Sequence, residues 1–138
     1  MATNIRPKIS EKNKYWISKH RHYELKHFCL QYNTWKKMYA ELDGFSGGTN
    51  DSVYARVSTP SDPTANCVEI KTAYLERMDL VRRTAYEADP DLANYIFKAV
   101  TEDLSFTYLK SRLNIPCGRD MYYDRYRKFF WLLSKARN

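Results

Sequence analysis

Glycine and proline, the residues that punctuate turns, are scarce in this chain and unevenly placed. The 138 residues include four glycines and five prolines, and three of the glycines fall between positions 44 and 48. An all-β fold needs turn residues at short, regular spacing along its whole length. Hydrophobic residues make up 43% of the chain and aromatic residues 15%, which is enough for a core at this size. We therefore expect an all-α protein of one domain, or one domain plus an arm.

The first 60 residues divide into an arm, a helix and a loop. Residues 1–14 are polar and basic without periodicity, and a flexible basic arm is predicted over residues 1–17. Residues 18–60 are predicted to contain a long N-terminal helix ending near Gly44, followed by a long loop over 43–61. A short strand over 53–57 fits the composition of the loop but has no partner strand in the sequence. The helix is indicated by apolar residues at three- and four-residue spacing: Leu25, Phe28, Tyr32, Trp35 and Tyr39.

The remaining residues, 61–138, carry repeated helix-start signals. A capping side chain followed by proline fits the beginning of a helix, because proline is tolerated at the first helical position. Pro116 disfavours helical geometry at Ile115, so the chain must break there before a final long helix. A longer helix, a short helix, a tight turn and a long helix are the order of a helix-turn-helix in a tri-helical bundle. The start signals are Ser61 or Asp62 before Pro63, Asp89 before Pro90, and Ser105 before the short helix.

The final helix is predicted to bury one side and expose the other. The expected buried stripe is Tyr122, Tyr126, Phe129 or Phe130, and Leu133. The expected exposed side carries Arg119, Asp120, Tyr123, Asp124 and Arg127. Arg119 lies in the first turn, where its side chain can reach base edges and pair in two-pronged fashion with guanine. The alternative is a three-helix core with an ordinary charged exterior.

Other polar residues of this region are better placed for phosphates, which fix the register of a protein on DNA without reading sequence. The hydroxyls of Ser105 and Thr107 lie near a helix start, where an anion is favoured. The basic candidates for phosphate contacts are Lys110, Arg125, Arg127 and Lys128.

Charge is distributed in three blocks along the chain. Residues 1–42 hold nine lysines or arginines against three acidic residues, a net charge of +6, and residues 105–138 hold eight against two, also +6. Residues 43–104 hold six against eleven, a net charge of −5. Two basic ends suggest a shared anionic partner, and we expect double-stranded DNA. Ordinary surface charge is the alternative interpretation.

Three stretches carry a family resemblance: "SDPT" before a long helix, a helix ending in "AVTED", and "SFTYLKSRLNIPCGRDMYYDRYRKFFWLL". Together, over about residues 61–134, they resemble the small phage transcription regulators of the ArpU/RinA type. The C-terminal half of those proteins is similar to the helix-turn-helix of sigma-70 region 4. The family's recognition-helix pattern, "t-[FVY]-Y-r-x-[KR]-[KR]", corresponds to "GRDMYYDRYRKFF", residues 118–130.

The resemblance implies a promoter-binding role and places base recognition at Arg119, Asp120, Tyr123 and Asp124. The chain departs from the family pattern at two places. Gly118 stands where serine is usual, and Phe129 and Phe130 stand where small and aliphatic residues are common.

Catalysis and metal binding find little support in the sequence. The chain has no Gly-rich phosphate loop and none of the common hydrolase or metalloprotease motifs. His20 and His22 are two residues apart, on different sides of a helix, and no second ligand pair follows at zinc-finger spacing. We expect no enzyme activity, no catalytic residue, no metal and no cofactor.

Three widely spaced cysteines and the lack of an apolar signal-peptide core lead us to expect a cytoplasmic protein of the host cell, with no membrane partner. The N-terminal helix could stack on nucleic acid, but a core or dimer helix with a basic face is the favoured interpretation. RNA polymerase, a host protein and a second copy of the chain are further candidate partners. The alternative function is a phage-encoded inhibitor that binds a host nucleic-acid-binding defence complex.

Overall fold

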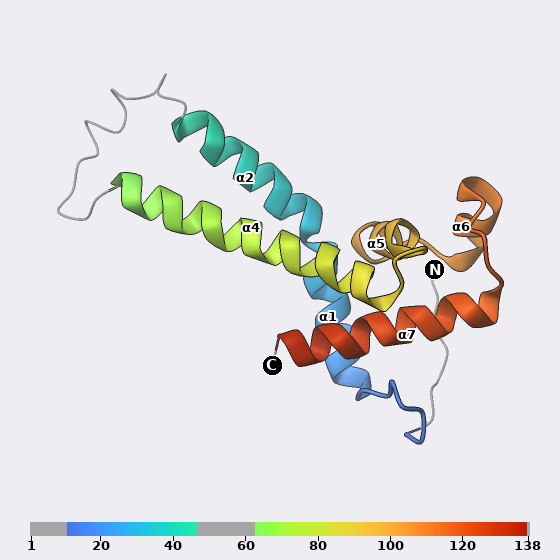
Figure 1. Ribbon diagram of the computed structural model, residues 1–138. Helices are drawn as coiled ribbons and strands as arrows, with labels where there is room; N and C mark the ends of the chain where they lie inside the picture. Colours follow the sequence, from blue (N-terminus) through green and yellow to red (C-terminus); the bar gives the residue numbers. More distant parts are fainter. Residues whose placement is uncertain (1–10, 47–62, 138) are drawn as a thin grey trace. The chain divides into compact units, whose positions relative to one another are not determined.

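The computed structural model describes residues 11–46 and 63–137, and these form six α-helices and no strand. This confirms the expected all-α class; the strand considered over 53–57 lies outside the described residues. The chain divides into two units (Figure 1). Among the described residues, the first unit comprises residues 11–31 and 80–137, and the second unit comprises residues 32–46 and 63–79. The helices are α1 (Lys19–Leu30), α2 (Tyr32–Ser46), α4 (Pro63–Ala88), α5 (Ala93–Glu102), α6 (Phe106–Leu113) and α7 (Arg119–Ala136).

The prediction of a single N-terminal helix is wrong, because a break at Gln31 divides this segment into α1 and α2. Ser18 caps α1 by accepting a hydrogen bond from the N–H of Arg21 at 3.2 Å. At the other end, the N–H of Gln31 bonds to the carbonyl of Phe28, three residues back, as well as to that of Cys29. Such bonds tighten the last turn of a helix and end its regular ladder. The break divides the apolar stripe, since Leu25 belongs to the first unit and Trp35 to the second.

Residues 11–15, expected to belong to the flexible arm, form a turn in the first unit. The side chain of Asn13 accepts a hydrogen bond from the N–H of Tyr15 at 2.8 Å, and its carbonyl accepts from the N–H of Trp16 at 3.0 Å. The ring centroid of Tyr15 lies 5.4 Å from that of Trp131 in α7. This turn therefore contacts the last helix of the chain.

Two of the predicted helix starts are confirmed and one is displaced. Helix α4 begins at Pro63; its candidate caps, Ser61 and Asp62, lie outside the described residues. Ser105 caps α6 by accepting from the N–H of Tyr108 at 3.1 Å. Helix α5, however, begins three residues after Pro90, because residues 90–92 form a turn. The carboxylate of Asp89 accepts the backbone N–H groups of this turn instead of capping the helix, as aspartate commonly does in turns.

The core of the first unit is built where α1, α5 and α7 pack on one another. Four of the residues predicted for the inner side of α7 are buried: Tyr122, Phe129, Phe130 and Leu133. Tyr126, the remaining member of the predicted stripe, is partly exposed. Other buried members of this core are Leu25, Phe28, Val81, Leu92, Ile96, Val100, Phe106, Leu109 and Ile115.

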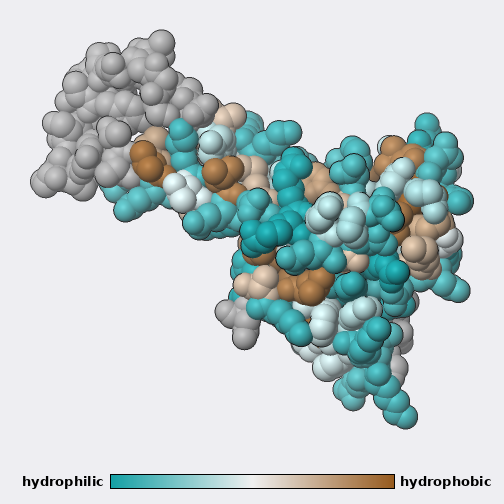
Figure 2. Space-filling model, in the orientation of Figure 1, coloured by the Kyte–Doolittle hydropathy of each residue, from teal (hydrophilic) through white to brown (hydrophobic). Residues whose placement is uncertain are grey.

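The second unit pairs α2 with the first part of α4. The thiol of Cys67 lies 3.9 Å from the carbonyl of Leu42, and the guanidinium of Arg77 lies 5.9 Å from the ring centroid of Trp35. Hydrophobic side chains show at the surface of these two helices, among polar ones (Figure 2). The exposed large apolar residues there are Met38, Val68, Ile70 and Leu75.

Candidate nucleic-acid interface

The connection between α6 and α7 is a tight turn with a buried centre. Asn114 ends α6 in the left-handed conformation (φ 55°), which asparagine tolerates better than most residues. The N–H of Ile115 bonds to the carbonyl of Leu109 at 3.1 Å, and the Ile115 side chain is 1% exposed. Ile115 is outside the helix, as its position before Pro116 predicts. The turn is therefore anchored from within, and the angle between α6 and α7 is fixed by packing.

The first turn of α7 is open to solvent. Arg119, Asp120 and Met121 are exposed. The guanidinium of Arg119 lies 5.1 Å from the ring centroid of Phe106, an attractive cation–π arrangement. The ring restricts Arg119 without neutralising its charge, so the nitrogens of the guanidinium can still donate to a ligand.

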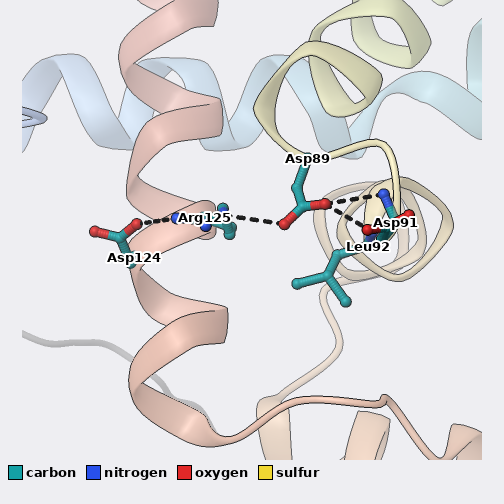
Figure 3. A network of polar contacts seen from close by, with 5 residues as sticks. All are labelled: Asp89, Asp91, Leu92, Asp124 and Arg125. Carbon is teal, nitrogen blue, oxygen red and sulfur yellow. Dashed lines mark hydrogen bonds and ion pairs between the residues drawn. The ribbon is translucent and has the colours of Figure 1, made fainter.

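Arg125, one of the expected phosphate contacts, is partly exposed and is held by two carboxylates. Its Nε donates to Oδ2 of Asp89 at 2.9 Å, and a second nitrogen donates to Asp124 (Figure 3). The hydrogen bond that Arg125 donates to Asp89 raises the pKa of Arg125 above its usual value. Oδ1 of Asp89 accepts from the N–H groups of Asp91 and Leu92 at 2.9 and 3.3 Å. A single carboxylate thus ties α7 to the turn between α4 and α5, and Asp124 is engaged on the same arginine.

Lys110 and Ser105 also make contacts within the protein. The ammonium of Lys110 lies 3.4 Å from the carbonyl oxygen of Ile115 and 3.5 Å from that of Cys117. These long hydrogen bonds hold the turn and leave the ammonium exposed. Ser105 Oγ serves as the cap of α6, whereas the side chain of Thr107 is exposed beside it.

Tyr123 lies in an aromatic cluster and is only partly exposed. Its ring centroid is 5.0 Å from that of Tyr122, 6.0 Å from that of Tyr126 and 6.4 Å from that of Phe106. Burial raises the pKa of Tyr122 well above its usual range. This aromatic cluster lies on the inner side of α7. Tyr123 is at the solvent edge of the cluster and does not share the open face with Asp120.

Arg127 and Lys128 lie farther along α7 and are half-buried. Nε of Arg127 is buried and has no hydrogen-bond partner among the described residues. Lys128 is in no ion pair within the part of the chain that the structure describes. Lys128 therefore keeps its donors for an anionic ligand.

Behind α7, His22 of α1 is packed against rings and titrates at low pH. Its ring meets that of Phe130 edge-on at 4.7 Å and lies 6.2 Å from that of Tyr126. Burial, with a smaller contribution from the charge of Lys26, lowers the pKa of His22 to about 4 from the usual 6.5. Between pH 6.5 and 4, His22 is therefore largely neutral in the folded protein and largely protonated in the unfolded chain.

Stability should therefore fall as the pH drops from 6.5 towards 4, because only the unfolded chain takes up this proton in that range. We expect the free energy of unfolding to decrease by about 2 kcal/mol between pH 7 and pH 5 through this group. Urea unfolding at a series of pH values measures the decrease. His22→Gln should remove this contribution, and His20→Gln, at an exposed position on the same helix, should retain it. Equal pH profiles for the two variants would contradict the assignment.

Gly118, at the N-cap of α7, has space for a side chain. Its φ is −84°, which any residue adopts, and a Cβ built there meets no atom within 4 Å. Gly118→Ser should raise the free energy of unfolding by about 0.5–1 kcal/mol, since serine caps a helix start and restricts the unfolded chain. Thermal unfolding compares it with Gly118→Ala, which restricts the unfolded chain but cannot cap. An alanine variant as stable as the serine variant would contradict a capping role.

Sequence reasoning missed two features of this region. The sequence predicts Asp89 as a helix cap, and nothing in the sequence links it to Arg125, 36 residues away. Arg112 and Tyr108 of α6 are exposed next to the turn and were not selected, although the excess of basic residues after position 105 includes Arg112.

No family model, curated protein or solved structure was found to match the chain. Within residues 11–46 and 63–137, no group of three or more histidine, cysteine or acidic side chains is arranged to hold a metal ion. None of the helices in those ranges combines the length and the apolar character needed to cross a membrane.

Proposed function

We propose that this chain is a phage-type transcription regulator that binds double-stranded DNA through α6, the turn and the first turns of α7. One observation carries the proposal: α7 is anchored by buried rings and by the Asp89–Arg125 pair, while Arg119 and Asp120 at its start remain exposed. A recognition helix needs this combination, because its N-terminal residues must reach base edges while the rest holds a fixed angle.

The residues take different roles in the proposed complex. Arg119 donates to the O6 and N7 acceptors of guanine, and Asp120 accepts from the amino group of cytosine. The ring of Phe106 limits the conformations of Arg119, so less entropy is lost on binding. Thr107, Arg127 and Lys128 contact phosphates, which sets the register of the protein on the duplex. No bond is made or broken, and the mechanism is binding alone.

The test is a titration of specific and scrambled duplexes by fluorescence anisotropy. Arg119→Ala should reduce the ratio of the two affinities by about 10- to 100-fold, since a two-pronged contact with guanine contributes about 1–3 kcal/mol of discrimination. The control is Arg83→Ala, which removes the same charge from an exposed position on α4 and should leave the ratio unchanged. An unchanged ratio for Arg119→Ala would remove this residue from base recognition.

A protein-binding inhibitor is the second candidate, favoured by the exposed apolar side chains of the second unit. Met38 on α2 and Val68 and Leu75 on α4 are each more than a third exposed. Under the first proposal, the same surface serves a second copy of the chain or RNA polymerase. Capture of a host nucleic-acid-binding protein, together with no affinity for any duplex, would favour the inhibitor.

A further inference from the structure

A second basic surface is assembled in the first unit from segments more than a hundred residues apart. It consists of Lys14 and Tyr15 before α1 and of Lys128, Trp131 and Lys135 on α7, and we call it the lysine–aromatic cluster. The ammonium of Lys135 lies 3.6 Å from the ring centroid of Trp131. Tyr15 packs on the same tryptophan at 5.4 Å, and the ammonium of Lys14 lies 5.1 Å from the ring of Tyr15.

Rings, and not carboxylates, hold two of the three cations of this cluster. A cation over an aromatic ring is attracted without losing its charge or its remaining hydrogen-bond donors. Among the described residues, Lys14, Lys128 and Lys135 take part in no ion pair. The nearby Arg21 differs, since its guanidinium bonds to Glu24 and to Ser134. The cluster therefore presents three uncompensated positive charges, two of them fixed by rings.

The cluster continues the solvent-facing side of α7 that begins with Asp120. Positions 120, 124, 128, 131 and 135 follow one another at three- and four-residue steps, so they share one side of the helix. The opposite side is the buried one, with Phe129 and Leu133 completely inaccessible. At 1.5 Å per residue, Lys135 lies about 24 Å along the axis from Arg119, and Lys128 about 14 Å. A ligand that meets the first turn of α7 can reach the cluster only if it is long.

We propose that the lysine–aromatic cluster binds backbone phosphates of double-stranded DNA, several base pairs from the bases read by Arg119. The inference rests on the proposed function for the identity of the duplex. Charge complementarity favours the phosphate backbone, and the distance fits an extended polyanion, since about seven base pairs at 3.4 Å span the same length. The cluster contributes affinity and salt dependence, and it contributes no sequence preference.

The experiment uses the full chain with lysine pairs changed to glutamine. Lys14→Gln with Lys135→Gln removes the two ring-held charges, and Lys36→Gln with Lys37→Gln removes two exposed charges from α2 as the matched control. Binding to a duplex is measured by anisotropy between about 50 and 200 mM salt. The cluster variant should flatten the plot of log affinity against log salt by about two units of slope, at about 0.9 per lost phosphate contact. Its ratio of specific to scrambled affinity should stay unchanged, and the α2 variant should keep the slope of the parent protein.

Replacement of Lys14 and Lys135 by arginine should restore the slope, because charge and cation–π contact are both kept. A cluster variant whose slope equals that of the α2 variant overturns the proposal. The same holds if, in a parallel titration with single-stranded DNA, the variant flattens the slope there and not with the duplex. The outcome is separable from that of Arg119→Ala. If Arg119→Ala leaves discrimination unchanged while the cluster variant flattens the slope, base reading fails and the phosphate surface stands.

Discussion

Phe130→Ala is expected to lower the free energy of unfolding by about 3–5 kcal/mol, the range found when a buried phenylalanine is truncated. The ring is 1% exposed and lies between α1 and α7. Its centroid is 4.7 Å from that of His22, 5.0 Å from that of Tyr126 and 5.0 Å from that of Phe129. Truncation leaves a cavity among rings that cannot collapse far. Urea unfolding followed by circular dichroism measures the change from the midpoint and slope.

The control for Phe130→Ala is Met121→Ala on the same helix. Met121 is 45% exposed, so its truncation should change stability by no more than about 0.5 kcal/mol. Similar effects for the two variants would mean that the outer and inner sides of α7 have been exchanged. Such a result would also place the residues proposed to meet DNA inside the core.

Asp89→Ala is expected to cost about 3 kcal/mol, because it breaks a partly buried ion pair and removes an acceptor from two backbone N–H groups. The side chains of Arg125 and Asp89 are 32% and 10% exposed, so solvent screens the pair only in part. A double-mutant cycle with Arg125→Ala should give a coupling energy of about 1–3 kcal/mol. The same unfolding experiment provides all four free energies.

An exposed ion pair provides the comparison for this cycle. Lys26 and Asp103 approach to 3.7 Å, with Asp103 63% exposed, and such pairs contribute about 0–1 kcal/mol. Asp103→Asn is the suitable change, because position 103 has a φ of 57°, which asparagine tolerates. If the effects of Asp89→Ala and Arg125→Ala on the free energy of unfolding were additive, the turn between α4 and α5 would not be what holds α7 in place.

Much of the helical fold could be predicted from the sequence, because local signals determine it. Pro63 and Ser105 mark helix starts through geometry and hydrogen bonds within one turn. The spacing of the rings in α7 correctly indicated its buried side. The break at Gln31 could not be predicted in this way, since the apolar stripe from Leu25 to Tyr39 runs through it without interruption. That stripe serves two separate units, and periodicity does not distinguish one core from two.

The candidate site could be predicted only where exposure follows from helical spacing. Arg119 and Asp120 are exposed as expected, and their contacts with DNA stay a prediction. The ion pair of Arg125 could not be predicted, because its partner is a carboxylate in a distant turn. The lysine–aromatic cluster was likewise hidden, since it brings Tyr15 onto Trp131. Both arise from tertiary contacts, which leave no pattern of spacing in the sequence.

Selection of bound duplexes from a random pool tests the central claim most directly, because it asks whether the exposed start of α7 reads DNA sequence. We predict that the protein enriches one shared motif containing at least one guanine. Arg119→Ala should lose about 1–3 kcal/mol of preference at that base pair. Its preference at the other positions should be unchanged. A pool that stays random, or a motif that Arg119→Ala selects unchanged, would contradict the account.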